Sequence, residues 1–68
     1  MKRQVFVYKD DAGEWRWRLL ASNGKTLADS GEGYRERNKA IRIARSVFKG
    51  MGYGLEYWGR TEYVREAL

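Results

Sequence analysis

The chain has 68 residues and a formal net charge of +5; 43% of its residues are hydrophobic, 15% aromatic and 34% charged, with no Cys, His or Pro. This length accommodates one small core and excludes a second domain; the lack of Cys excludes disulfides and thiolate metal sites and favours a cytoplasmic location. The longest apolar run, Val5 to Tyr8, is far too short to span a membrane, so no membrane contact is expected.

Two strands and a hairpin turn are predicted in the first part of the chain. Val5 to Tyr8 is β-branched and aromatic throughout, which is typical of a strand. Glu14 to Ala21 alternates in polarity and places Trp17 and Leu19 on the same face of a second strand. Asn23-Gly24 indicates a type I′ hairpin turn, in which both central residues need positive φ.

A two-residue turn fixes the register of the third strand. Counting outward from the turn, the predicted partners are Leu20 and Leu27, Leu19 and Ala28, Arg18 and Asp29, and Trp17 and Ser30. The third strand then offers only small residues beside the Trp17 ring, which leaves room for a helix on that face. We therefore expect Trp17 and Leu19 to be buried under the helix.

One helix is predicted from about Arg35 to Gly50. Its start is open between two residues, because Glu36 suits a first helical turn whereas Asn38 is the better N-cap. Apolar residues recur at helical spacing and predict a buried stripe with Ile43 on its edge, formed by Ala40, Ile41, Ala44, Val47, Phe48 and Met51.

The last eighteen residues form an aromatic tail. Tyr53, Leu55 and Tyr57 alternate, which predicts a short fourth strand. Val64 and Leu68 are four residues apart, which predicts a last helical turn that Thr61 would cap. We therefore divide the chain into a unit of residues 1–50 and a tail of residues 51–68 that packs on the domain or on a partner.

The first strand is apolar on both faces, whereas a single helix covers only one. Val5 and Val7 share one face, and Phe6 and Tyr8 share the other. Either the tail or a partner chain covers the second face, or the strand lies at an edge with one partly exposed ring. The predicted fold is α+β: a three-stranded antiparallel sheet packed on one helix in the order β-β-β-α, with a short fourth strand in the tail.

These residues resemble the YegP-like family of small uncharacterised proteins. The resemblance rests on Trp15-Arg16-Trp17-Arg18-Leu19, Ala21-Ser22-Asn23-Gly24, Glu32-Gly33-Tyr34 and the helix residues Ala40 and Ser46-Val47. It implies a β-β-β-α unit that occurs as tandem or paired copies, so a homodimer is expected from this single unit. It implies no catalytic residues and no established activity.

The positive charge is concentrated in the predicted helix. Residues 34–50 contain six cations and one carboxylate, a net +5 that equals the charge of the whole chain. At 100° per residue, five cations form a stripe opposite the apolar one: Arg35, Lys39, Arg42, Arg45 and Lys49. Such a stripe indicates a surface for nucleic acid or an acidic protein, although a solvated helix face that favours solubility has the same pattern.

A protein-interaction module is the alternative function. Tyr and Trp dominate interface hot spots, and the tail follows a glycine-rich corner. The predicted contact residues are Tyr53, Tyr57, Trp58 and Tyr63, together with the outer face of the first strand.

A further alternative is that the sheet itself reads bases. Arg16 and Arg18, next to Trp15, resemble the outward side chains of sheet-based DNA readers. Asp29 opposite Arg18 would blunt their positive field, and cross-strand ion pairing explains the same residues.

Catalytic and metal sites are not predicted. Without His or Cys, general acid–base chemistry would need a carboxylate, Lys or Tyr with a shifted pKa in a pocket, which a chain this short has little room to build. The sequence therefore predicts a non-enzymatic protein without metal or cofactor.

Overall fold

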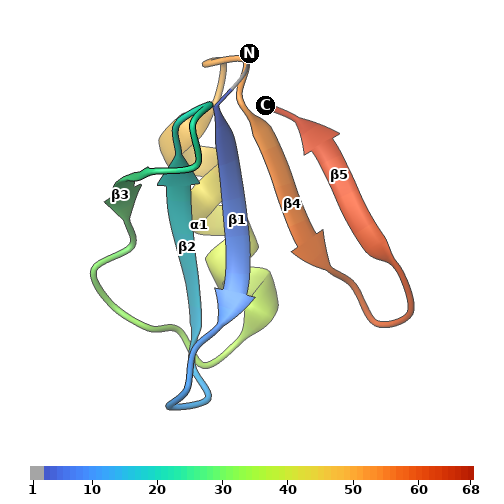
Figure 1. Cartoon of the computed structure of the whole chain (residues 1–68). Helices are drawn as coiled ribbons and strands as arrows, with labels where there is room; N and C mark the ends of the chain where they lie inside the picture. The colour runs from blue at the N-terminus through green and yellow to red at the C-terminus, as the bar shows by residue number, and fades with distance from the viewer. Residues whose placement is uncertain (1–2) are drawn as a thin grey trace.

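The computed structural model describes residues 3–68 and shows one helix lying against one face of a five-stranded sheet (Figure 1). The helix α1 spans Arg37–Phe48. The strands are β1 (Gln4–Lys9), β2 (Trp15–Leu20), β3 (Thr26–Asp29), β4 (Gly54–Trp58) and β5 (Tyr63–Ala67). The α+β class is confirmed.

The sheet is larger than predicted and is mixed rather than antiparallel. Its order is β3-β2-β1-β4-β5, with β1 in the centre. The β1–β2, β2–β3 and β4–β5 pairs are antiparallel, whereas β1 and β4 run parallel. The predicted three-stranded antiparallel sheet is therefore incomplete, because the tail extends it by two strands.

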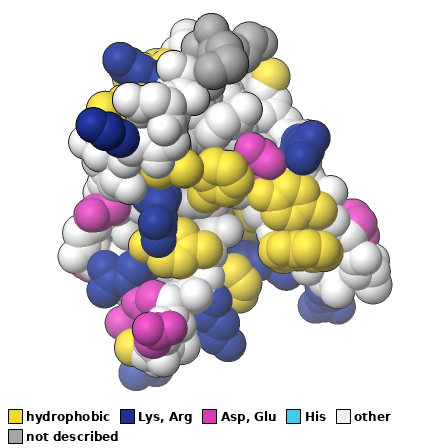
Figure 2. Space-filling model, viewed as in Figure 1, with side chains coloured by type: hydrophobic (Ala, Val, Ile, Leu, Met, Phe, Trp, Pro, Cys, Tyr) yellow, Lys and Arg dark blue, Asp and Glu magenta, His cyan; other side chains and the backbone are white. Residues whose placement is uncertain are grey.

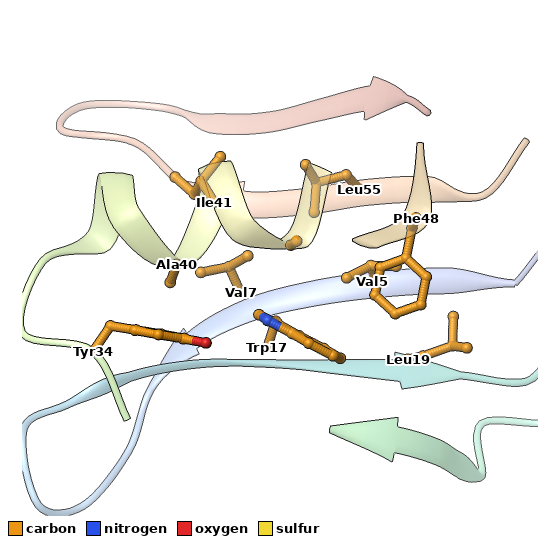
Figure 3. Packing of buried hydrophobic residues seen from close by; sticks show 10 residues of the cluster. Val5, Val7, Trp17, Leu19, Tyr34, Ala40, Ile41, Phe48 and Leu55 are labelled. Atoms are coloured by element: carbon orange, nitrogen blue, oxygen red, sulfur yellow. The ribbon is translucent and has the colours of Figure 1, made fainter. Parts of the chain in front are cut away.

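The core lies between α1 and the inner face of the sheet (Figure 3). The sheet contributes Val5, Val7, Trp17, Leu19 and Leu55, and the helix contributes Ala40, Ile41, Ala44 and Phe48. The Trp17 ring meets the Phe48 ring edge-on, with centroids 5.1 Å apart. The prediction that Trp17 and Leu19 face the helix is confirmed, since each is only 7% exposed.

The β2–β3 turn differs from the prediction, although much of the register survives. Gly24 has a φ of 86°, whereas no residue other than glycine among residues 3–68 has a positive φ, so the type I′ turn is wrong. Bonds from the Gly24 N–H to the Ala21 carbonyl (2.9 Å) and from the Ala21 N–H to the Lys25 carbonyl (2.8 Å) close a three-residue loop, one residue longer than predicted, which shifts Leu20 opposite Thr26. A bulge next in the ladder restores the predicted Leu19–Ala28 and Arg18–Asp29 pairs.

A close approach of two segments explains the glycine in the Glu32-Gly33-Tyr34 motif. Tyr34 and Trp15 exchange two backbone hydrogen bonds, of 2.7 and 2.8 Å, which bring the chain beside β2. A Cβ on Gly33 would lie 2.6 Å from the side chain of Glu14. Only glycine fits there without displacing that side chain, and the approach carries the buried Tyr34 ring into the core.

The helix is shorter than predicted, and its apolar stripe is narrower. Glu36 is the N-cap residue, in an extended conformation without a side-chain cap bond, so Asn38 is not the cap. Val47 and Met51 are 48% and 53% exposed, contrary to the prediction. Met51 lies beyond the helix end at Phe48, so helical spacing does not apply to it.

The tail is part of the sheet. β4 confirms the predicted fourth strand, and its Leu55 is fully buried. The predicted last helical turn is wrong, because Tyr63–Ala67 forms the edge strand β5 and pairs with β4. The tail therefore extends the sheet sideways and does not cover the outer face of β1, which is central and not an edge strand.

Candidate polyanion-binding face

The outward side of α1 carries the predicted cations. The buried residues Ala40, Ile41, Ala44 and Phe48 fix which side of the helix faces the sheet. The turn of the helix places Lys39 and Arg42 on the opposite side, where both are exposed. Lys49 is the exposed C-cap residue and lines a hollow with Arg45 and the end of β5. Arg35 is also exposed and directly precedes the Glu36 N-cap.

Arg45 differs from the other cations because it is ion-paired. Its Nε donates to Glu66 Oε1 on β5 at 3.1 Å, and its Nη2 donates to the Tyr57 hydroxyl at 3.3 Å. Hydrogen bonding to the Glu66 carboxylate raises the pKa of the Arg45 guanidinium further above its usual value. Arg45 thus links the helix to the edge of the sheet, and its charge is compensated.

The other four cations of the predicted stripe have no carboxylate partner among the described residues. The ion pairs among residues 3–68 are Asp10–Arg16, Glu66–Arg45 and Glu56–Arg65, and none includes Arg35, Lys39, Arg42 or Lys49. We call these four residues the basic face. The Lys39 ammonium lies 5.8 Å from the centre of the Tyr34 ring, which leaves it open to solvent and to an anion.

Arg37 is the sixth cation of this segment and lies outside the basic face. Its Nη1 donates to the carbonyl of Trp58 at 3.3 Å, and its Nε is buried without a hydrogen-bond partner. Arg37 therefore reaches toward β4 and contributes to the positive charge near the helix start without joining the exposed stripe.

The structure separates the four tail aromatics into two pairs. Tyr53 and Tyr57 are half-buried on the helix side; the Tyr53 ring lies 5.9 Å from Phe48. Trp58 and Tyr63 lie on the opposite face and are 63% and 36% exposed. Their rings meet edge-on at 5.1 Å, and burial, followed by the nearby Glu56 carboxylate, raises the pKa of the Tyr63 phenol. Only this second pair is free to meet a partner.

The outer face of the sheet brings further aromatic and apolar residues together. Phe6, Tyr8, Arg18 and Leu20 line a hollow of about 300 Å³. Figure 2 shows hydrophobic side chains gathered over this face, with cations and carboxylates between them. The alternation of residues in the first strand predicted that Phe6 and Tyr8 share this face. The sequence did not predict that Trp58 and Tyr63 would join the same face, because that depends on the position of β4 next to β1.

The arrangement on this face does not favour base reading by the second strand. Trp15 packs against the core on the helix side, whereas Arg16 and Arg18 lie on the outer side. Arg16 Nε donates to Asp10 Oδ2 at 2.6 Å, and the Arg18 guanidinium lies 4.2 Å from the centre of the Tyr8 ring. Arg16 is therefore committed to a contact within the chain, and Arg18 rests on a ring of the hollow.

Neither a metal cluster nor a membrane-crossing helix is found among residues 3–68. No group of three or more His, Cys, Asp or Glu residues in this part of the chain is placed to hold a metal ion. Its helix lacks the length and apolarity needed to cross a bilayer.

Comparisons with known proteins agree with the resemblance predicted from the sequence. The profile of a family described as "Domain of unknown function (DUF1508)" matches residues 10–51. UPF0339 protein Atu0232 of Agrobacterium fabrum is 46% identical over 60% of this chain and 64% of its own length. UPF0339 protein Atu5359 of the same organism is 42% identical over 63% of this chain and 68% of its own length.

A solved structure has the same fold over most of the chain. The NMR solution structure of a protein from Haloferax volcanii has a TM-score of 0.65 and 44% sequence identity to this chain. The likeness covers 74% of this chain and 83% of that one. The matched region spans less than two thirds of the first Agrobacterium relative and 38% of a Stutzerimonas stutzeri relative, the "UPF0339 protein in ptx operon 5'region".

Proposed function

The chain belongs to the DUF1508 family, whose description names no activity. From the surface of the protein we propose that it is a non-enzymatic module that binds a polyanion, first of all nucleic acid, through the basic face. The absence of His and Cys from the sequence supports a binding role over a catalytic one. A cytoplasmic location is part of the same proposal.

The observation that carries the proposal is the uncompensated charge of the basic face. Arg35, Lys39, Arg42 and Lys49 are exposed along α1 and at its two ends, and they lack carboxylate partners within residues 3–68. The charges outside residues 34–50 cancel, so the positive field of the protein is centred on the helix. Clustered Lys and Arg of this kind attract phosphate backbones and release their counterions.

The charge order along the helix supports a binding role over a stabilising one. The first turn contains no acidic residue and instead has Arg37 and Lys39 near the positive end of the helix dipole. Cations at that end are unfavourable for the helix, whereas acidic residues there typically contribute about 0.3–1 kcal/mol. The rest of the helix has the favourable order, with Glu36 at the N-cap and with Arg45 and Lys49 at the negative end. The support for a binding role therefore comes from the first turn alone.

The shape of the basic face fits contacts with phosphates. Lys39 and Lys49 are ten positions apart, which corresponds to about 15 Å along the helix axis. Long flexible cations spread over this distance can follow a backbone, and backbone contacts position a protein without reading sequence. We therefore expect binding that depends strongly on salt and little on base sequence.

The test compares two variants that remove equal charge from different surfaces. One replaces Arg35, Lys39, Arg42 and Lys49 with Gln; the control replaces the exposed Arg3, Lys9, Lys25 and Arg60 with Gln. Each removes two Arg and two Lys, and the affinity for a fluorescent DNA duplex is measured at about 50 mM NaCl, where phosphate contacts are strong.

The basic-face variant should lose at least tenfold more affinity than the control variant. Equal losses would show that net charge alone determines binding, and an absence of binding by the unmodified protein would contradict the nucleic-acid proposal. A polyglutamate competitor tests whether the basic face binds an acidic protein instead. If it does, polyglutamate should displace the DNA when the two polymers are present at equal concentrations of negative charge.

The homodimer implied by the family resemblance stays a prediction. Two copies would double the basic face and strengthen binding by avidity. Sedimentation velocity of the free protein measures its mass directly.

A further inference from the structure

The outer face of the sheet is an open aromatic surface on the side away from the basic face. The helix packs on the other side, and no described element lies over the outer face of the sheet (Figure 1). The strand register places Phe6, Tyr8, Trp58 and Tyr63 on that outer face. Trp58 is 63% exposed. Contiguous exposed apolar patches on small proteins typically mark interaction sites, and Trp and Tyr are enriched among the residues that contribute most to binding.

These rings are held in fixed positions. Trp58 and Tyr63 are a cross-strand pair of β4 and β5, and their rings contact edge-on. Tyr8 is covered on one side by the Arg18 guanidinium, 4.2 Å from its centre. Because these contacts already restrain the side chains, little conformational entropy is lost when a ligand binds to them.

The outer face carries no excess of positive charge, in contrast to the basic face. Its three guanidinium groups belong to Arg16, Arg18 and Arg65, and four carboxylates lie among them, those of Asp10, Glu14, Asp29 and Glu56. Asp10 contacts Arg16 at 2.6 Å, Glu56 contacts Arg65 at 3.2 Å, and Asp29 is the register partner of Arg18. A surface without excess positive charge does not favour a polyanion. Because Arg16 and Arg65 already have carboxylate partners, an uncharged partner can bind without breaking an ion pair.

The hollow lined by Phe6, Tyr8, Arg18 and Leu20 supplies a place for an anchor. Its volume of about 300 Å³ is sufficient for a large apolar side chain, and three of its four lining residues are apolar or aromatic. Anchor side chains that fill such pockets carry much of the affinity of protein interfaces.

We propose that the outer face of the sheet docks an apolar, uncharged segment of a protein partner. One large side chain of the segment enters the hollow, and neighbouring residues lie against Trp58 and Tyr63. A short segment covers the rings and leaves the exposed parts of the Arg16 and Arg65 guanidinium groups in water, while their partners Asp10 and Glu56 are already largely buried. A second copy stacked over the whole face would desolvate these ion pairs in both chains, which is costly. This inference is independent of the basic face.

The test selects peptides from a displayed library of random dodecamers on the unmodified protein. The peptides are then titrated against Trp58→Ser, which alters the outer face, and Met51→Ser, which removes an apolar side chain elsewhere that is also more than half exposed. Enriched peptides should carry a large apolar residue and little net charge. They should bind Trp58→Ser at least tenfold more weakly, and bind Met51→Ser and the basic-face variant with unchanged affinity.

Amide chemical shifts provide the location, and circular dichroism verifies that each variant is folded. Bound peptide should shift residues of β1, β2 and β4 rather than α1. Three results would overturn the proposal: peptides that bind the two serine variants equally, oligothymidine binding that Trp58→Ser abolishes, or self-association that Trp58→Ser abolishes. The second would assign the face to single-stranded nucleic acid, and the third to another copy of the chain.

Discussion

Leu55 shows how far the tail is integrated into the core. It is fully buried, and its register partner on β1 is Val5, which is also fully buried. Replacing Leu55 with Ala should lower the free energy of unfolding by about 2–5 kcal/mol, through lost burial and the cavity that remains. Urea titration followed by circular dichroism measures this change.

Leu27 provides the matched control for that substitution, because the same side chain is 49% exposed there. Leu27→Ala should change the free energy of unfolding by no more than about 0.5 kcal/mol, as is usual for exposed positions. Equal effects at the two positions would contradict the placement of the tail in the core.

Asp10 couples the stability of the first hairpin to pH. Its carboxylate accepts hydrogen bonds from Arg16 Nε at 2.6 Å and from the Glu14 N–H at 2.9 Å. These contacts, the Arg16 bond first, hold the pKa of Asp10 below its ordinary value of 3.8. The stabilisation is therefore complete above that value and is lost as the pH falls through the lower pKa of the folded state.

Because the pKa of Asp10 is lowered in the folded protein, removing its carboxylate should destabilise the protein only where that carboxylate is ionised. Asp10→Asn should be less stable than the unmodified protein at neutral pH, and the difference should shrink as the pH falls below about 4. Thermal melts from neutral pH to about pH 2 test this, with Asp11→Asn as the neighbouring control. A difference that is constant with pH would contradict the role of the Asp10 carboxylate.

At the scale of elements, the sequence predicted the first half better than the tail. Alternation in β2 correctly placed Trp17 and Leu19, and the Arg18–Asp29 pair was correct although the turn type was wrong. That agreement arose because the longer loop and the bulge shift the register in opposite directions. The spacing of residues within a strand predicts which face of the sheet each residue occupies. It does not predict where a bulge will offset the register shift that a loop introduces.

The tail illustrates the limit of spacing arguments. Val64 and Leu68 are four residues apart, and an interval of four fits both the helical period and the strand period of two. The parallel pairing of β4 with β1 joins residues about fifty positions apart, which no local pattern encodes. The same long-range pairing explains why the outer aromatic surface was only partly predicted.

Removing β4 and β5 tests whether the tail is structural. A chain that ends after residue 51 loses Leu55 and exposes β1 as a new edge. It should show no cooperative thermal unfolding, because the remaining core is too small to offset the loss of chain entropy. A cooperative melt near that of the full chain would assign the tail a docking role and exclude it from the core.

At the scale of the whole molecule, the two broad surfaces differ in chemistry. The helix and its two ends carry four unpaired cations within the described chain, whereas the exposed sheet side carries rings without an excess of positive charge. The basic face was predicted from the sequence in all but Arg45, whose partner Glu66 lies on the unpredicted β5. Separate surfaces allow a polyanion and a protein partner to bind at the same time.

The salt dependence of DNA binding tests the central claim most directly. If Arg35, Lys39, Arg42 and Lys49 each contact a phosphate, the logarithm of the association constant should fall against the logarithm of NaCl concentration with a slope of about −3.6 for a duplex. The basic-face variant should bring that slope close to zero, and the variant at Arg3, Lys9, Lys25 and Arg60 should leave it nearly unchanged. An equal slope in the unmodified protein and the basic-face variant would contradict the account.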